Sequence, residues 1–293
     1  MQRWKIIIVG GDRREVELCR LWQEEGLEVA LAGFEKYPSL KKASEADLAQ
    51  ANVLITPLSG IKAPGTVTAV YAASQPLQIM PILKKPAGKY LLLTGSVAPE
   101  LAPHLPDRAY PVLTADNAEL AALNAVPTAE GAIQKAMELS AKTLHGSNVL
   151  VVGLGHCGTV LARMLQGLGA RVSAAVRRPE TAALAETMNI KAFFVDELVD
   201  KAGDMDFIFN TAPALLLNEP VLKTLPKSAI ILDLASEPGG TDFATAEALG
   251  LQALLLPGLP GKAAPYTAAE ILSRVYRRLI SAKISSLTEG GGR

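Results

Sequence analysis

The stretch SNVLVVGLGHCGTVLARMLQGLGARV, residues 147–172, constrains the fold of this chain more than any other segment. An apolar run at its start is followed by an amphipathic helical segment and then by a second apolar run. Gly153, Gly155 and Gly158 precede the helical segment in the G-x-G-x-x-G spacing. Three glycines alone are weak evidence, but this order of strand, glycine turn, helix and strand is typical of dinucleotide-binding folds. The alternative is a structural turn beside an empty crevice.

Each residue of this loop has an expected task. Gly153 permits a tight turn, Gly155 lets the backbone approach a pyrophosphate, and Gly158 allows close packing of helix against strand. The pyrophosphate would meet the free N–H groups and the positive end of the helix dipole. The cofactor-binding candidates in this loop are Gly153, Leu154, Gly155, His156, Cys157 and Gly158.

Two of these candidates have competing interpretations. His156 is placed to reach a phosphate oxygen, but a solvated surface imidazole is an equal alternative. Cys157 lies at a helix start, where the pKa of a thiol can fall. A packing role is nevertheless favoured for Cys157 over a nucleophilic one, because no base is visibly paired with it.

Apolar segments alternate with helical segments along the whole chain, which predicts parallel sheets built from βαβ units. The first half contains expected strands at 5–10, 28–34, 52–58, 89–95 and 109–113. The second half contains expected strands at 147–153, 170–176, 191–196, 206–210, 228–235 and 252–258, as a complete doubly wound fold requires. The predicted fold class is α/β, with two doubly wound Rossmann-like domains.

A pair of arginines replaces the acidic residue that NAD-binding chains carry after their second strand. Arg177 and Arg178 end the segment AVRRPE, and Pro179 is expected to start the next helix. A carboxylate at this place would repel a 2′-phosphate, whereas a guanidinium offers it a planar fork of donors. NADP is therefore the predicted cofactor and NAD the less favoured one, unless one or both arginines point into solvent.

Three further loops leave the carboxyl ends of expected strands, which is the edge where ligands bind in such sheets. They are FNTAPALLLN after the fourth strand of the second half, DLASEPGGTDF after the fifth and PGLPGKAAP after the sixth. Their glycines, prolines and small polar residues permit close approach of backbone to a ligand. The cofactor-binding candidates in these loops are Asn210, Thr211, Ala212, Pro213, Ala235, Ser236, Pro257 and Gly258.

We expect four parts along the chain. Residues 1–125 form a Rossmann-like substrate or partner domain, and 126–146 form a connector helix that Thr128 caps after Pro127. A shorter helix at 116–123 is expected before this connector. Residues 147–263 form the NADP-binding domain. Residues 264–293 carry a long amphipathic helix that packs back on the first domain.

Composition excludes several classes of function. Lysine plus arginine and aspartate plus glutamate balance at 29 each, so nucleic-acid or membrane-surface binding has little support. No segment is long and apolar enough for a signal peptide or a membrane span. Cys19 and Cys157 have no framework spacing and are expected to be reduced thiols in a cytoplasmic protein. No cluster has metal-ligand spacing, so no metal is expected.

No pair of residues marks an acid–base dyad of the dehydrogenase type, because the chain has only 3 histidines and none stands near an obvious partner. The catalytic group is therefore unassigned, and candidates for proton transfer or substrate orientation are Glu130, Thr128, Asn124, Asp242 and Lys262. Glu130 has the alternative role of a helix-start carboxylate.

The first domain has its own glycine turn, GGDRR, which lacks the third glycine of a dinucleotide loop. Asp12 is the expected cap of the helix that follows. Arg13 and Arg14 lie in the first turn, against the preference of the helix dipole for acids. They either face an anion or are ordinary surface arginines.

At this point the residues resemble one family, the A subunits of bacterial dipicolinate synthase. The resemblance spans nearly the whole chain and rests on VGGDRR, NAVPTAEG, TLHGSNVLVVGLGHCG, NTAPALLLN, LDLASEPGGTDF and PGLPGKAAPYTA. The longer strings are much more specific than the glycine spacing. The second domain is also similar to those of D-2-hydroxyacid and alanine dehydrogenases.

The resemblance implies an enzyme of a sporulating bacterium, in the cytoplasm of the mother cell. It would oxidise the product of dihydrodipicolinate synthase, in its dihydro or hydroxy-tetrahydro form, to dipicolinate with NADP+ as hydride acceptor. The flavoprotein-like B subunit of dipicolinate synthase is the implied partner, and a homo-oligomer is expected. By family position, the groups expected to bind the dicarboxylate in an interdomain cleft are Arg14, Ser59, Gly60, Gly95, Asn124, Thr128 and Glu130. A non-catalytic NADP(H)-binding or scaffold protein of the same complex is the alternative function.

Overall fold

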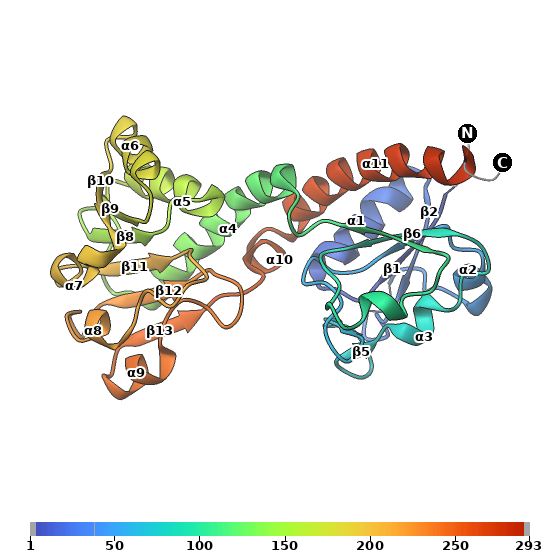
Figure 1. Ribbon diagram of the computed structural model, residues 1–293, viewed down its shortest axis with the longest axis horizontal. Coiled ribbons are helices and arrows are strands. Elements are labelled where there is room, and N and C mark those ends of the chain that lie inside the picture. Colours follow the sequence, from blue (N-terminus) through green and yellow to red (C-terminus); the bar gives the residue numbers. More distant parts are fainter. Residues whose placement is uncertain (1–3, 38, 290–293) are drawn as a thin grey trace. The chain divides into compact units, whose positions relative to one another are not determined.

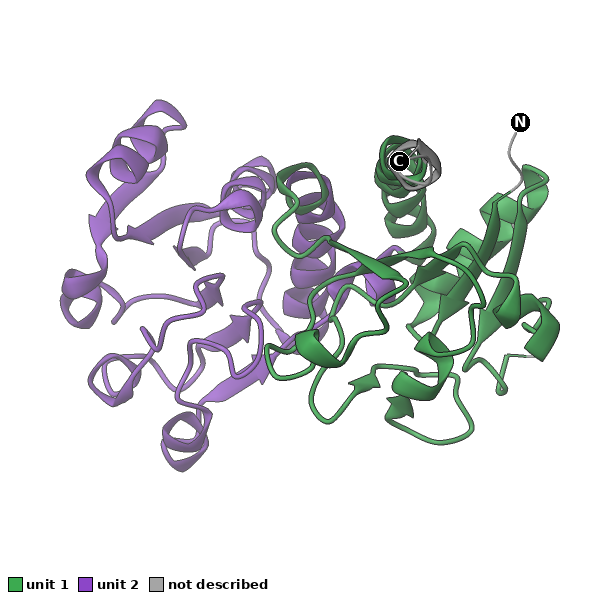
Figure 2. Ribbon diagram, turned by 45° about the vertical axis from the view of Figure 1, so that its right-hand side comes forward, with its two compact units in different colours: residues 1–121, 265–293 green, residues 122–264 purple. Residues whose placement is uncertain are grey.

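The computed structural model describes residues 4–37 and 39–289 and divides into two compact units. Unit 1 joins Met1–Ala121 to Pro265–Arg293, and unit 2 is Ala122–Ala264 (Figure 2). Each unit contains one larger sheet whose strands are all parallel. This confirms the predicted α/β class with two Rossmann-like bodies. No helix in the described part of the chain is long and apolar enough to cross a membrane.

The sheet of unit 2 has the strand order β10-β9-β8-β11-β12-β13. The strands are β8 (Asn148–Val152), β9 (Arg171–Val176), β10 (Lys191–Phe194), β11 (Phe207–Asn210), β12 (Ile230–Asp233) and β13 (Gln252–Leu255). The chain runs outward from β8 to β10 and then returns to β11 on the other side of β8. Strand order therefore reverses between β8 and β11, which is where a doubly wound sheet binds its ligand.

Helices cover both faces of this sheet (Figure 1), and buried apolar side chains form one cluster on each face. Successive residues of β8 alternate between the two faces, so Val149 and Val151 belong to one buried cluster and Leu150 and Val152 to the other. The helices of unit 2 include α5 (His156–Gly167), α6 (Pro179–Thr187), α7 (Leu198–Lys201), α8 (Glu219–Leu222), α9 (Phe243–Ala248) and α10 (Leu259–Ala263). A 3-10 turn, η2 (Val195–Glu197), precedes α7.

The sheet of unit 1 has the order β2-β1-β3-β6-β7. Its strands are β1 (Lys5–Val9), β2 (Glu28–Ala32), β3 (Val53–Ile55), β6 (Tyr90–Thr94) and β7 (Ala109–Leu113). A short antiparallel pair, β4 (Thr66–Val67) and β5 (Leu77–Gln78), is an addition that the sequence did not predict. The helical elements before α4 are α1 (Arg13–Glu24), α2 (Glu45–Ala49), α3 (Met80–Leu83) and η1 (Ala102–His104).

The last helix, α11 (Pro265–Glu289), packs against α1 within unit 1. The indole of Trp22 is fully buried and its Nε1–H donates to Ser273 Oγ at 2.7 Å. Tyr276 and Ile280 on α11 are buried in the same unit. This confirms the expected return of the C-terminal helix to the first part of the chain.

The connector helix differs from its predicted bounds. Helix α4 runs without interruption from Ala118 to Leu139 and contains Pro127 in its interior, so the predicted range 126–146 and the separate helix at 116–123 are wrong. Proline usually ends or kinks a helix because it lacks an N–H and crowds the preceding turn. Here the neighbouring Thr128 hydroxyl donates to the Asn124 carbonyl at 2.7 Å, so Thr128 is an interior residue and not a cap.

We expect Ser273→Ala to lower the free energy of unfolding of unit 1 by about 1–3 kcal/mol, because the buried Trp22 indole N–H would lose its acceptor. The double variant Trp22→Phe with Ser273→Ala should lose less than the sum of the two single changes, since it removes both polar groups. Urea unfolding followed by far-UV circular dichroism, a signal that does not depend on Trp22, measures this. Leu113→Ala, at a side chain that is 59% exposed, should stay within about 0.5 kcal/mol of the parent. If the double variant loses as much free energy of unfolding as the two single variants together, the hydrogen bond between Trp22 and Ser273 does not contribute to stability.

Candidate functional site

The turn between β8 and α5 is shaped by its three glycines. Gly153 has φ +88°, a conformation that side chains rarely adopt. A Cβ on Gly158 would lie 1.9 Å from the Gly153 carbonyl oxygen, so only glycine lets α5 approach the strand end this closely. A Cβ on Gly155 would have no atom within 4 Å and would point into open space. The backbone at Gly155 is therefore free to approach a ligand.

The start of α5 fits an anionic group. Gly155 is the N-cap of this helix, and no side chain of the described residues caps it. The first N–H groups of the helix and the positive end of its dipole are the elements that bind phosphate in other proteins. This uncapped start, together with the open space at Gly155, matches what the pyrophosphate of a dinucleotide requires.

Thr211 connects the loop after β11 to the same turn. Its N–H donates to the Val152 carbonyl at 2.9 Å. Its hydroxyl lies 3.0 Å from the carbonyl oxygens of Val152 and Gly153. Thr211 is one of the predicted cofactor-binding residues, and in the structure its side chain braces the glycine turn. The spacing of the glycines carried no signal of this contact.

The side chain of Asn210 is likewise engaged within the protein. It is fully buried, and its Nδ2 donates to Asp233 Oδ1 at 3.0 Å and to the Ala212 carbonyl at 2.9 Å. Its Oδ1 accepts from Ala212 N–H at 3.2 Å. Asp233 is a residue of this edge that sequence reasoning missed. A signal was present, because Asp233 is the one charged residue in the otherwise apolar run SAIILDLA.

The two arginines after β9 have different surroundings. Val152 pairs with Ala175 in the sheet, so the chain after Val176 leaves beside the glycine turn. Arg178 is the N-cap residue of α6, and its Nε lies 3.3 Å from Glu180 Oε1. Arg177 is exposed and forms no ion pair with any residue that the structure describes. Arg177 is thus the guanidinium that remains available for a ligand.

The side chains of His156 and Cys157 face different environments at the start of α5. His156 is exposed. Burial raises the pKa of the Cys157 thiol, and a hydrogen bond with Thr128 offsets this only in part. The direction is opposite to the lowering that a helix start can cause, so Cys157 stays a thiol and packs against α4.

The remaining cofactor candidates lie at the same edge, where β8, β11, β12 and β13 end. Leu154 and Ala235 are buried, and Ala235 N–H donates to Asp233 Oδ1 at 3.0 Å. Gly258 adopts φ +70° and is the N-cap of α10. The exposed cofactor-binding candidates in the loops after β11, β12 and β13 are Pro213, Ser236, Pro257 and Gly258.

The candidates for catalysis on α4 share one segment of helix. Glu130 is exposed and lies in the middle of α4, so the helix-start role considered for it is wrong. The Asn124 Oδ1 atom is buried and has no hydrogen-bond partner among the described residues. Of the other two candidates, Asp242 caps α9 by accepting from Thr245 N–H at 3.0 Å, and Lys262 lies in α10.

In unit 1, the residues expected to bind the dicarboxylate gather at one edge of the sheet. Arg14 follows β1, Ser59 and Gly60 follow β3, and Gly95 follows β6, and these three strands are neighbours. A Cβ on Gly95 would lie 1.8 Å from the Leu58 carbonyl oxygen, so the loops after β3 and β6 touch there. Ser59 Oγ lies 3.2 Å from Thr68 Oγ1.

Arg14 already has a carboxylate partner. Its Nε donates to Asp12 Oδ1 at 3.0 Å and its Nη2 to Asp12 Oδ2 at 2.9 Å, and the Arg14 side chain is only 12% exposed. Burial acts to lower the pKa of Arg14, but the Glu15 and Asp12 carboxylates raise it above its usual value. Asp12 caps α1 as predicted, in a capping box with Glu15. Burial raises the pKa of Glu15 itself to about 7.

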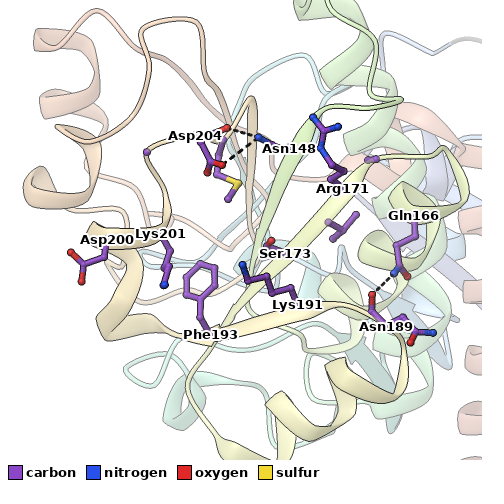
Figure 3. A pocket seen from close by; sticks show the side chains of 14 residues that line it. Asn148, Gln166, Arg171, Ser173, Asn189, Lys191, Phe193, Asp200, Lys201 and Asp204 are labelled. Carbon is purple, nitrogen blue, oxygen red and sulfur yellow. Dashed lines mark hydrogen bonds between the residues drawn. The ribbon is translucent and has the colours of Figure 1, made fainter.

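A hollow of about 740 Å³ lies at the opposite edge of the sheet of unit 2 (Figure 3). It is lined by Asn148, Arg171 and Lys191, which are the first residues of β8, β9 and β10. The glycine turn follows the carboxyl end of β8, so this hollow is separate from the candidate dinucleotide edge. Its lining also mixes cations with Asp200 and Asp204.

Comparisons with known proteins agree with this geometry. A family model for the N-terminal domain of the dipicolinate synthase A subunit matches residues 5–113, and one for the NAD binding domain of D-isomer specific 2-hydroxyacid dehydrogenase matches residues 120–238. The dipicolinate synthase A subunit of Bacillus subtilis (strain 168) is 34% identical over 286 residues, 94% of this chain and 96% of that protein. The second family model indicates a nicotinamide dinucleotide as the cofactor of unit 2.

Solved structures include another dipicolinate synthase A subunit that is similar to this chain. The crystal structure of the dipicolinate synthase A subunit from Bacillus halodurans matches with a TM-score of 0.85 and 31% identity, over 96% of this chain and 99% of that one. Transhydrogenase from Sinorhizobium meliloti matches with a TM-score of 0.65 at 13% identity, over 94% of each chain. The second likeness shows the fold alone.

We expect Gly155→Ala to fold like the parent but to bind a nicotinamide dinucleotide about tenfold or more weakly, because the added methyl occupies the space that the pyrophosphate needs. Gly158→Ala should instead lower the free energy of unfolding by about 1–3 kcal/mol, since α5 must move away from the Gly153 carbonyl. Titration calorimetry and thermal unfolding separate the two effects. Gly167→Ala, in open space at the end of the same helix, is the matched control and should leave binding unchanged without lowering the free energy of unfolding, since alanine favours a helix more than glycine does.

The raised pKa of Glu15 predicts a pH dependence of stability. Between the ordinary value of 4.5 and about 7 the folded chain holds a proton that the unfolded chain has released. Protonated Glu15 therefore adds to the free energy of unfolding. This addition is fully present below the pKa of Glu15 in the unfolded chain and is lost as the pH rises through the pKa of Glu15 in the folded chain. Glu15→Gln keeps a capping-box side chain and should flatten the fall in stability between pH 5 and pH 8. The exposed Glu24→Gln should leave that slope unchanged, and an unchanged slope in Glu15→Gln would refute the assignment.

Proposed function

Because this chain belongs to the family of dipicolinate synthase A subunits, we propose that it oxidises a cyclic dihydrodipicolinate to dipicolinate with NADP+. The substrate is the product of dihydrodipicolinate synthase, and its hydroxy-tetrahydro form first loses water. The ring gives up a hydride and a proton, so one NADPH and one H+ form for each dipicolinate. The observation that carries the proposal is the open, uncapped glycine turn before α5 in a chain of this family.

Each group at the dinucleotide edge is proposed to bind one part of the cofactor or to support a group that does. NADP+, when bound, supplies the hydride acceptor. The N–H groups at the start of α5 hold the pyrophosphate, and Thr211 keeps the turn in place through the Val152 and Gly153 carbonyls. Arg177 binds the 2′-phosphate, because it is exposed and is not engaged by a carboxylate in the way that Arg178 is.

The chemical half of the proposal relies on positioning more than on a strong base. Forming an aromatic ring is strongly favourable, so orienting the ring for hydride removal is the main requirement. The polar groups proposed to orient it are Asn124, Thr128 and Glu130 on α4. The groups proposed to bind its carboxylates are Arg14, Ser59, Gly60 and Gly95.

A non-catalytic NADP(H)-binding protein of the same complex is the second candidate function. The observation that favours it is the surroundings of the histidines. His145 Nδ1 lies 3.2 Å from the Leu168 carbonyl, away from the glycine turn, and His156 is exposed. No histidine in the described residues is hydrogen-bonded to a carboxylate, as the acid–base dyad of a dehydrogenase would be. In either case the proposed partner is the dipicolinate synthase B subunit, the proposed assembly includes further copies of this chain, and the proposed place is the mother-cell cytoplasm.

Formation of the reduced nicotinamide, followed by its absorbance with freshly made cyclic substrate, distinguishes the two functions. The chain alone should reduce NADP+ if it is the catalyst. Gly155→Ala serves as the control that folds but binds the dinucleotide weakly. If reduction requires the added B subunit while NADP+ still binds to this chain alone, the non-catalytic function holds.

The cofactor preference gives a separate prediction. Arg177→Ala should weaken NADP+ binding about tenfold or more, since a charge-assisted bond to phosphate contributes about 1.5–3 kcal/mol, and should leave NAD+ binding unchanged. Arg178→Ala should have a smaller effect because its guanidinium is shared with Glu180. Calorimetric titration of each variant with both dinucleotides measures this. The NADP assignment is wrong if the double variant keeps the NADP+ to NAD+ preference of the parent.

A further inference from the structure

Asp233, the last residue of β12, is a buried carboxylate that accepts hydrogen bonds from four groups. Its Oδ1 accepts from Asn210 Nδ2 and Ala235 N–H, both at 3.0 Å. Its Oδ2 accepts from Gly240 N–H at 2.8 Å and from the Thr241 hydroxyl at 2.7 Å. The residue has no exposed surface, so these donors stabilise its charge in place of water.

The four donors come from two different segments of the chain. Asn210 ends β11 and shapes the loop that follows it, whereas the other three belong to the loop after β12. At Gly240 the two loops meet, because a Cβ there would lie 2.4 Å from the Ala214 carbonyl oxygen and 2.5 Å from the Ala212 carbonyl oxygen. One carboxylate therefore bonds to groups of both segments, which also bond directly to each other where the N–H groups of Leu216 and Leu217 donate to the Gly240 carbonyl at 3.1 and 3.0 Å.

Both loops lie in one half of the dinucleotide crevice. A doubly wound sheet consists of two mononucleotide-binding halves that meet where strand order reverses. The half made by β8 and β9 carries the glycine turn and Arg177, which are the groups for the pyrophosphate and the 2′-phosphate of the adenosine. The half made by β11 and β12 is thereby left for the nicotinamide nucleoside (Figure 1).

We infer that Asp233 is a positioning residue for the nicotinamide half of the cofactor. It contacts no ligand, but it holds the loops after β11 and β12 in the arrangement that the nicotinamide riboside requires. The inference rests on the proposed NADP-binding function and adds to it which buried group shapes the reactive half of the crevice. A carboxylate is needed because all four neighbours are donors, whereas an amide would present its own N–H to one of them.

The test compares a whole ligand with half of it. In Asp233→Asn we expect NADP+ to bind at least about tenfold more weakly, and adenosine 2′,5′-bisphosphate, which lacks the nicotinamide half, to bind as in the parent. Calorimetric titration of the full chain measures both. Thr241→Val removes a single donor and should weaken NADP+ binding by a smaller factor. This variant can replace Asp233→Asn in the test if Asp233→Asn does not fold.

Asp206→Asn is the matched control. Asp206 is a carboxylate at the opposite edge of the same sheet, where it accepts from Asn148 N–H at 3.0 Å and Lys142 Nζ at 2.6 Å. Its removal should lower stability and leave both ligands unaffected. Equal weakening of both ligands in Asp233→Asn, or no weakening of NADP+, would overturn the inference. If the parent chain binds neither ligand, the proposed cofactor is wrong and the inference fails with it.

Discussion

The contact between Gly158 of α5 and the Gly153 carbonyl is the constraint on which the dinucleotide edge depends. Because neither residue has a side chain, the first turn of the helix lies directly against the end of β8. The N–H groups at the helix start consequently reach the surface uncovered. Thr211 donates to the same carbonyl from the end of β11, so the central strands and the helix are held in one arrangement. Such an uncovered helix start is the element that binds phosphate in other proteins.

The two halves of the crevice are built by different physical means. The half made by β8 and β9 depends on charge, through helix N–H groups and the exposed guanidinium of Arg177. The half made by β11 and β12 carries the buried carboxylate of Asp233, which accepts hydrogen bonds from Asn210 and from the segment after β12. This division suits a dinucleotide whose phosphates are charged and whose nicotinamide must be oriented for hydride transfer.

The polar groups at the carboxyl edge of unit 1 are largely engaged with one another. Arg14 forms a two-bond pair with Asp12, and Glu15 completes the capping box while buried. An incoming carboxylate would therefore meet a guanidinium whose charge is already shared. The tight loop contacts at Gly60 and Gly95 leave backbone groups as the other binding elements at this edge.

The sequence alone determined the class of fold and the place of the dinucleotide turn, because strand periodicity and glycine spacing are local properties of the backbone. It also placed Arg177 and Arg178 after β9 but could not tell them apart, since both lie close to Glu180 in the sequence and the structure shows that Glu180 pairs with Arg178. Asn210 and Thr211 were found by position, yet their partners lie 23 and 58 residues away in the chain. The tertiary structure alone decided that α4 continues through Pro127 and that Asp233 joins two loops. The role of Asp233 depends on contacts with residues as far along the chain as Asn210, which no local pattern records because they form only when distant segments pack together.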